Sequence, residues 1–264
     1  MISPPPAEEV AVAPVKQKTK VAKKEIPVVE TLSDEKGIFD DAEHQLKVDL
    51  SKWKLISDEL GVQTYEKVSS NSGLVAFRGE TLISAPLKKI ATILNTDSFQ
   101  KDWVDSFVES KILSKKDELE RIEYNQTSVP WPFQNRDFVF KSVSKLNVRP
   151  PTALITMQSL TDPAMPPRVG IVRGEMIHSY YYLKEIPGIN ATKMVVEMEV
   201  NPKGEIPMWL VNLSQKGWPQ NTLLALKKLS IREDISVLPS IENFFEVKKQ
   251  LVVKKKQKQK GKTI

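Results

Sequence analysis

The sequence predicts an α+β fold in which one curved antiparallel sheet wraps around a long C-terminal helix. After a first helical pattern come two strand patterns, and a short helical insert follows them. Six further strand patterns lie between Phe107 and Pro202, and their mostly short connections favour an antiparallel meander. The last apolar pattern, from Ile206 to Leu229, has a helical period and a wide apolar arc, so it can pack against a sheet.

The first element is predicted to be an amphipathic helix that ends at Gly61. Its apolar residues recur at spacings of three and four: Leu46, Leu50, Trp53, Ile56 and Leu60. Strand alternation follows at 62–68 and 74–83, and the turn cluster between these segments predicts a hairpin. Pro86 then opens a helix that continues through Leu94.

The six later strands are predicted near 107–113, 117–124, 137–147, 152–160, 170–186 and 192–200. The final helix begins at Ile206, and Gly217 and Pro219 predict a kink in it or a join between two helical pieces. A second helical stretch is expected to end near Phe244 and Phe245.

Charge divides the chain into a body and two tails. The net charge is +6, but five lysines fall within 16–24 and eight within 248–262. The body between them carries about −5, which makes a poor surface for nucleic-acid phosphates. We therefore predict a disordered Pro/Lys-rich tail at 1–44, one domain at 45–247, a disordered Lys-rich tail at 248–264, and no nucleic-acid partner.

Composition limits the chemistry. The chain has no Cys and only two His, so a disulfide framework, a Cys nucleophile and a multi-His metal site are not expected. Neither a metal nor a cofactor is predicted. The first residues show no basic and apolar signal pattern, and no apolar run approaches the ~20 residues that span a membrane. As written, this favours the cytoplasm, although a removed signal would leave the same sequence and the compartment stays unknown.

A series of short motifs shares its order with one known family. They are Trp53-Lys54-Leu55, Arg78-Gly79-Glu80, Ala85-Pro86, Trp103, Pro130-Trp131-Pro132, Arg136-Asp137-Phe138-Val139 and Ile206-Pro207-Met208-Trp209. Together they resemble the START domain, the lipid-transfer module related to the steroidogenic acute regulatory protein. The resemblance covers roughly 46–229. It implies the helix-grip fold, with a lipid-sized cavity between the sheet and the C-terminal helix, and a single bound lipid.

Strand alternation supplies candidate residues for the wall of that cavity. Met194, Val196 and Met198 share one face of their strand. Met176, His178 and Tyr180 are predicted to share a face of the preceding strand. A solid core would show the same periods. The further cavity residues implied by the resemblance are Phe140, Met157, Trp209, Asn212 and Leu213.

Sterol-binding members of the family carry an acid–base pair in the cavity. The resemblance places the acid at Glu123 and the base at Ser142, which is not a base, so Arg121 is the candidate to replace it. This departure leaves phospholipid, fatty acid or another apolar ligand open. Arg136 and Asp137 are interpreted as a structural ion pair that fixes the preceding loop, in preference to a charge relay.

Three further expectations concern access to the cavity and partners. The proline-rich segment 161–169 resembles the omega loop beside the cavity mouth, with Pro163 and Met165 in a gate that includes the final helix. The Lys-rich tails are candidates for transient contact with anionic membranes, at on the order of 1 kcal/mol for each lysine, or they only aid solubility. The protein is expected to be a monomer.

The leading interpretation is a binding protein that transfers or senses one lipid and is not an enzyme. The alternative is a helix-grip enzyme of the cyclase or aromatase type that acts on a hydrophobic substrate. A nucleic-acid or scaffold protein that works through its basic tails is a third reading.

Overall fold

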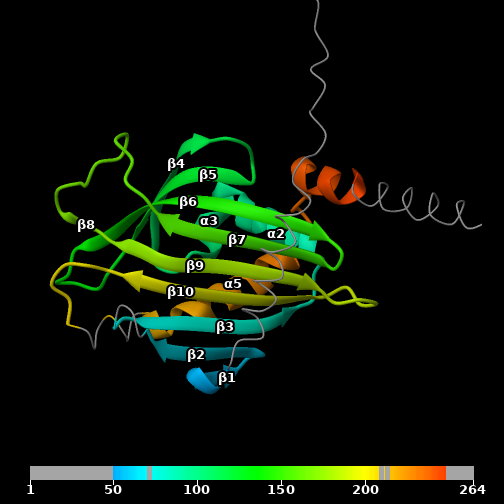
Figure 1. Ribbon diagram of the computed structural model, residues 1–264, viewed down its shortest axis with the longest axis horizontal. Coiled ribbons are helices and arrows are strands. Elements are labelled where there is room, and N and C mark those ends of the chain that lie inside the picture. Colours follow the sequence, from blue (N-terminus) through cyan, green and yellow to red (C-terminus); the bar gives the residue numbers. More distant parts are fainter. Residues whose placement is uncertain (1–49, 70–72, 208–210, 212–214, 248–264) are drawn as a thin grey trace, which may run out of the picture.

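The computed structural model describes residues 50–247, apart from 70–72, 208–210 and 212–214. A large curved sheet dominates it, and the helices lie on one face (Figure 1), which confirms the predicted α+β fold. The strands are β1 (Lys54–Glu59), β2 (Val62–Val68), β3 (Val75–Ile83), β4 (Phe107–Lys115), β5 (Glu120–Thr127), β6 (Asn135–Val148), β7 (Pro151–Ser159), β8 (Ile171–Arg173), β9 (Glu175–Glu185) and β10 (Thr192–Asn201). The helices are η1 (Leu50–Lys52), α2 (Leu87–Asn95), η2 (Asp97–Phe99), α3 (Gln100–Trp103) and α5 (Trp218–Ser230), and 239–247 is also helical.

The sheet order is β1-β2-β3-β10-β9-β7-β6-β5-β4, and neighbouring strands on this path are antiparallel. The predicted strand at 170–186 is two strands, because pairing is interrupted at Gly174 and the short β8 pairs in parallel with the start of β6. A Cβ atom at Gly174 would lie 2.4 Å from a ring carbon of Phe138. Any larger residue at this position would therefore require the Phe138 ring to move.

The predicted first helix is wrong where the structure describes it. Residues 54–59 form the edge strand β1, and Leu46 lies outside the described residues. Leu60 and Gly61 have φ values of 55° and 69°, a conformation that joins two antiparallel strands in a tight turn. Pairing with β2, including an ion pair of 2.8 Å between Lys54 and Glu66, outweighed the helical spacing.

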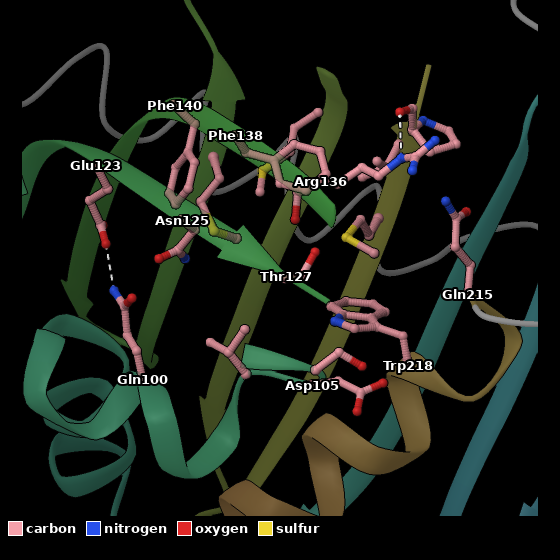
Figure 2. A pocket seen from close by; sticks show the side chains of 18 of the residues that line it. Gln100, Asp105, Glu123, Asn125, Thr127, Arg136, Phe138, Phe140, Gln215 and Trp218 are labelled. Carbon is pink, nitrogen blue, oxygen red and sulfur yellow. Dashed lines mark hydrogen bonds between the residues drawn. The ribbon is translucent and has the colours of Figure 1, made fainter. Parts of the chain in front are cut away.

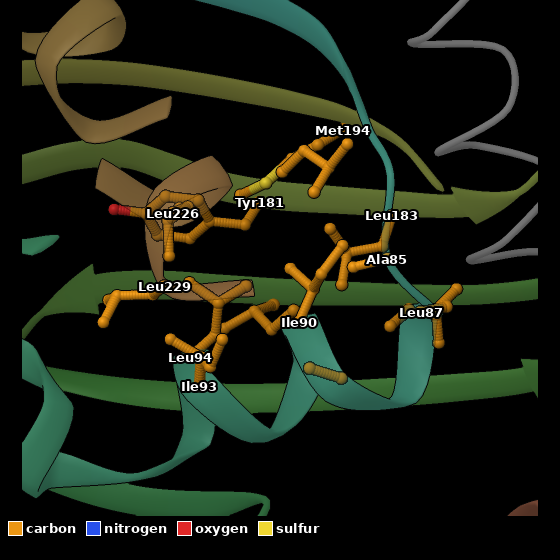
Figure 3. Close-up of a cluster of buried hydrophobic side chains, with 14 of the residues drawn as sticks. Ala85, Leu87, Ile90, Ile93, Leu94, Tyr181, Leu183, Met194, Leu226 and Leu229 are labelled. Atoms are coloured by element: carbon orange, nitrogen blue, oxygen red, sulfur yellow. The ribbon is translucent and has the colours of Figure 1, made fainter. Parts of the chain in front are cut away.

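The core lies between the inner face of the sheet and helices α2 and α5 (Figure 3). Ile90, Ile93 and Leu94 of α2 meet Leu226 and Leu229 of α5 in this cluster. The two α-helices therefore share one apolar layer that covers the middle of the sheet.

Helix α5 approaches β3 closely at one glycine. A Cβ atom at Gly79 would lie 2.7 Å from a methyl carbon of Leu223 and 2.9 Å from Pro219 Cβ. The helix begins at Trp218, with Gly217 as its N-cap and Pro219 in its first turn, where a missing N–H costs little. The sequence predicted a kink, or a join between two helical pieces, at Gly217 and Pro219. The predicted residues Trp209, Asn212 and Leu213 fall outside the described residues.

Candidate functional site

A cavity of about 460 Å³ lies between the inner face of the sheet and the helices. Small-molecule sites typically have volumes of about 300–1,000 Å³. The strand residues that line it are Arg121, Glu123, Asn125, Thr127, Arg136, Phe138, Phe140, Ser142, Ile155, Met157, Met176, Ser179, Tyr181, Met198 and Val200. Leu94, Gln100, Trp103, Trp218 and Asn221 line it from the helices.

Most of this wall is apolar and adaptable. Phe138, Phe140 and Val200 form a buried cluster, and Met157, Met176 and Met198 pack against it. All six residues line the cavity. Methionine side chains are flexible and polarisable, so they fit irregular apolar shapes. The wall therefore suits an apolar guest of variable outline.

Three aromatic residues also line the cavity. The rings of Trp103 and Tyr181 meet edge to face, with centroids 5.7 Å apart, and the Trp218 ring lies 6.5 Å from that of Tyr181. Burial and, secondly, the charge of Glu123 raise the pKa of Tyr181 far above its usual value. Its hydroxyl therefore stays protonated at every physiological pH.

A buried ion pair closes one end of the cavity. Arg121 Nε lies 2.6 Å from Glu123 Oε1, and the two side chains are only 4% and 2% exposed. They share a strand face because they are two residues apart on β5. Gln100 Nε2 of α3 donates to the other Glu123 oxygen at 2.5 Å (Figure 2). Arg121 and Glu123 are therefore in contact, and the replacement of the missing base by Arg121 stays a prediction.

Three buried polar atoms of residues that line the cavity lack a hydrogen-bond partner among the described residues. They are Gln100 Oε1, Asn125 Oδ1 and Trp103 Nε1. Sequence reasoning missed all three residues as site candidates. Asn125 follows Glu123 by two positions, so strand alternation could have found it, whereas the helix that carries Gln100 and Trp103 has only four residues and gives little periodic signal.

The predicted ion pair between Arg136 and Asp137 is wrong, because adjacent strand residues point to opposite faces. Asp137 is fully buried and pairs with Arg173 at 2.7 Å. Arg136 lines the cavity and donates to the backbone carbonyls of Gln134, Pro202 and Lys203. Burial lowers its pKa. Each residue does fix a loop, but through different partners.

His178 and Tyr180 do not line the cavity, although Met176 does. The register between β9 and β10 shifts, since Glu199 pairs with His178 and Val200 with Met176. The extra residue, Ile177, reverses the alternation of side chains along β9. Ser179 and Tyr181 therefore take the inner positions that the sequence assigned to His178 and Tyr180.

The side chains of His178 and Tyr180 face outward and join a polar cluster on the outer face of the sheet. Tyr180 donates to Glu197 at 2.8 Å, and Arg78 lies 3.1 Å from the same carboxylate. His178 lies 3.3 Å from its other oxygen. Burial alone would raise the pKa of Glu197, but hydrogen bonds from His178 and Tyr180 and the charge of Arg78 hold it below the usual value.

The remaining predicted residues fall into three groups. Arg121, Glu123, Phe140, Ser142, Met157, Met176 and Met198 line the cavity. Met194 and Val196 face inward but are packed in the core beneath α5. Pro163 and Met165 lie in the loop from 160 to 170 between β7 and β8, outside the cavity wall.

Among the described residues, no group of three or more His, Asp or Glu side chains is arranged to hold a metal ion. None of the helices in this part of the chain is both long and apolar enough to cross a membrane.

Residues 40–218 match the sequence model of the START domain. An uncharacterized protein of Pseudomonas aeruginosa is 28% identical over 176 residues, which cover 66% of this chain and 85% of that protein. Mouse phosphatidylcholine transfer protein is 25% identical over 179 residues, 67% of this chain and 82% of that protein.

Solved structures agree on the fold. A STAR-related lipid transfer protein fragment from Xanthomonas axonopodis has 26% identity and a TM-score of 0.60, and the match covers 69% of this chain and 99% of that one. Human StAR-related lipid transfer protein 5 has a TM-score of 0.66 at 18% identity, covering 74% and 93%.

Proposed function

Because the chain belongs to the START domain family, we propose that it binds one lipid molecule in the cavity between its sheet and its helices, for transfer or sensing. The observation that carries this proposal is the 460 Å³ cavity with its wall of phenylalanine and methionine side chains. Relatives that bear the name of phosphatidylcholine transfer protein or of lipid transfer proteins support the same class of ligand.

Binding of a lipid in this cavity requires only the transfer of apolar groups out of water. Moving methylene groups from water into an apolar cavity gives about 0.8 kcal/mol each, before the costs of immobilising the ligand are subtracted. A chain of ~15 methylenes thus has enough driving force for stable capture. No covalent step is needed, and we propose that the protein is not an enzyme.

Entry and exit need a moving element, since the ligand lies beneath the helices. We propose that the gate consists of α5 and the loop 160–170 with Pro163 and Met165. Trp218 and Asn221 of α5 line the cavity, so movement of this helix would uncover it. Docking on an anionic membrane through the Lys-rich tails remains a proposal about residues outside the described part of the chain.

Solvent extraction tests the proposal. The full chain is purified without detergent, extracted with organic solvent, and the extract is analysed by mass spectrometry beside an extract of a similarly expressed unrelated protein. One lipid class in molar amounts close to the protein is expected. A chemically altered product that accumulates when hydrophobic substrates are added would favour the cyclase-like enzyme instead.

A further inference from the structure

The chain continues beyond α5 into a segment that packs against α2. Residues 231–247, which we call the C-terminal strap, follow directly on α5, and 239–247 form a helix (Figure 1). Ile235, Ile241 and Phe245 of the strap are buried in the same apolar core as α2 and α5. The strap lies beyond residues 40–218, so the match to the START domain model says nothing about its role.

Hydrogen bonds attach the first half of the strap to α2. Lys89 Nζ donates to the carbonyl oxygen of Arg232, one residue beyond the C-cap of α5. Further along, the backbone N–H of Leu238 donates to Thr92 Oγ1 at 3.0 Å. Thr92 is only 2% exposed, so water does not readily replace this acceptor. The path of the chain after α5 is therefore fixed by α2.

One lysine of α2 holds the helix at the end of the strap. Lys88 Nζ lies 2.8 Å from a carboxylate oxygen of Glu242 and 3.3 Å from one of Glu246. It also lies 5.8 Å from the centre of the Phe245 ring. Partial burial opposes the charge of Lys88, but the hydrogen bonds to both glutamates outweigh it and raise the pKa of this side chain. Lys88 therefore stays charged and paired at neutral pH.

The two ends of α5 are held differently. Leu226 and Leu229, near its C-terminal end, are buried in the core, and the strap continues from this end. Trp218 and Asn221, near its N-terminal end, line the cavity. The side-chain amide of Asn221 donates to Asp105 at 3.4 Å in an exposed position. The end of α5 that covers the cavity is thus the end without the strap.

Two movements of α5 could uncover the cavity, and the strap makes one of them costly. Lifting the whole helix would pull the strap from α2 and expose Ile235, Ile241 and Phe245 to water. Tilting the helix about its C-terminal end leaves the strap in place. It breaks contacts of the first turns, those with Gly79 and Asp105 among them. Tilting exposes less apolar surface, so it is the easier movement.

We propose that the C-terminal strap fixes the C-terminal end of α5 as the pivot of the gate and thereby sets how fast a lipid enters and leaves the cavity. No residue of the strap lines the cavity, so the strap acts on the opening of the gate and leaves the contacts of the bound molecule unchanged. This inference rests on the proposed function and adds a rate-controlling element to it.

Stopped-flow fluorescence of the delipidated full chain with the uncharged apolar dye N-phenyl-1-naphthylamine tests the inference. Lys88→Met removes both ion pairs of the strap and leaves no buried lone charge, because Glu242 and Glu246 are 44% and 50% exposed. The association and dissociation rates should both rise about threefold, while Kd changes by less than about twofold. Lys54→Met is the matched control, since it breaks an exposed ion pair with Glu66 on β2 and should keep both rates.

Thr92→Val weakens the strap at a second point. It leaves the N–H of Leu238 without its acceptor, so both rates should rise by about fivefold, again with little change in Kd. Hydrogen exchange of the unliganded chain provides a readout that needs no ligand. Backbone amides of the last turn of α5, at 226–230, should exchange faster in both variants than in the wild type.

The outcomes distinguish this inference from the proposed function. Wild-type rates in both variants, or an altered Kd at unchanged rates, would overturn the inference and leave lipid binding intact. Wild-type hydrogen exchange at 226–230 in both variants would overturn it as well. If the wild-type chain binds neither the dye nor any lipid that solvent extraction recovers, the proposed function fails and the inference fails with it.

Discussion

At the scale of single residues, two ion pairs hold buried carboxylates inside the fold. Arg121 with Glu123, and Asp137 with Arg173, form ion pairs of 2.6 and 2.7 Å. A buried charge that loses its partner is costly, so these pairs constrain which side chains the fold accepts. Their contribution can be measured separately from ligand binding.

Replacing Arg121 with Met should reduce the free energy of unfolding by about 3–5 kcal/mol, because the Glu123 carboxylate would stay buried without its cation. Urea unfolding measures this change. The double variant Arg121→Met with Glu123→Leu should recover much of the loss, since no lone charge remains. A single variant as stable as the wild type would show that the pair is solvated in solution. Lys116→Met, which breaks an exposed pair with Glu120, is the control and should change little.

The outer-face cluster predicts a dependence of stability on acid pH. The pKa of Glu197 is lower in the folded protein than in the unfolded chain, where it is about 4.3. The stabilisation is therefore complete above that value and is lost as the pH falls through the folded pKa. Urea unfolding between pH 6 and pH 3 should show this decline, and Glu197→Gln should flatten part of it. An unchanged slope in Glu197→Gln would assign the decline to other carboxylates.

At the scale of elements, the strands were predictable and their faces only partly so. Alternation and turn residues predicted six strands from 107 to 201, and the structure has seven there, because the predicted strand at 170–186 is divided into β8 and β9. The faces of His178 and Tyr180 were not predictable, since one extra residue at Ile177 reverses them and only the pairing with β10 reveals it. The prediction of a first helix was wrong, because the spacing of apolar residues gives no information about the tight turn at Leu60 and Gly61.

The contact between α5 and β3 depends on a glycine. Gly79→Ala should destabilise the protein by about 1–3 kcal/mol, because the new methyl group overlaps Leu223 and Pro219. Chemical unfolding measures the loss. Gly79→Ala with Leu223→Ala relieves part of the overlap and should be less destabilised than the sum of the two single changes. Strict additivity would show that the helix simply moves away.

The proposed gate predicts a difference in hydrogen exchange. Backbone amides of α5 and of the loop 160–170 should exchange faster than those of β6, β7 and β9, because opening the cavity requires the first two segments to move and leaves the sheet paired. Hydrogen exchange with mass spectrometry resolves these segments. If α5 and the loop were as protected as the central strands, the gate would have to lie elsewhere.

At the scale of the whole molecule, the fold leaves space between a curved sheet and the helices that cover it. The family could be predicted because several short motifs occur in order, although each alone is weak. The contact between Gln100 and Glu123 in the cavity wall could not be predicted, because it joins elements that are distant in the sequence. Lipid binding therefore depends on the space between sheet and helices being available to a guest.

Native mass spectrometry of the full chain tests this most directly. After incubation with phosphatidylcholine vesicles that contain a small fraction of 1-oleoylglycerol and other lipids, the protein is separated and its intact mass is measured. We expect a species heavier than the polypeptide by a single lipid, which collisional activation releases. A protein that keeps the mass of the bare polypeptide at every lipid concentration would contradict it.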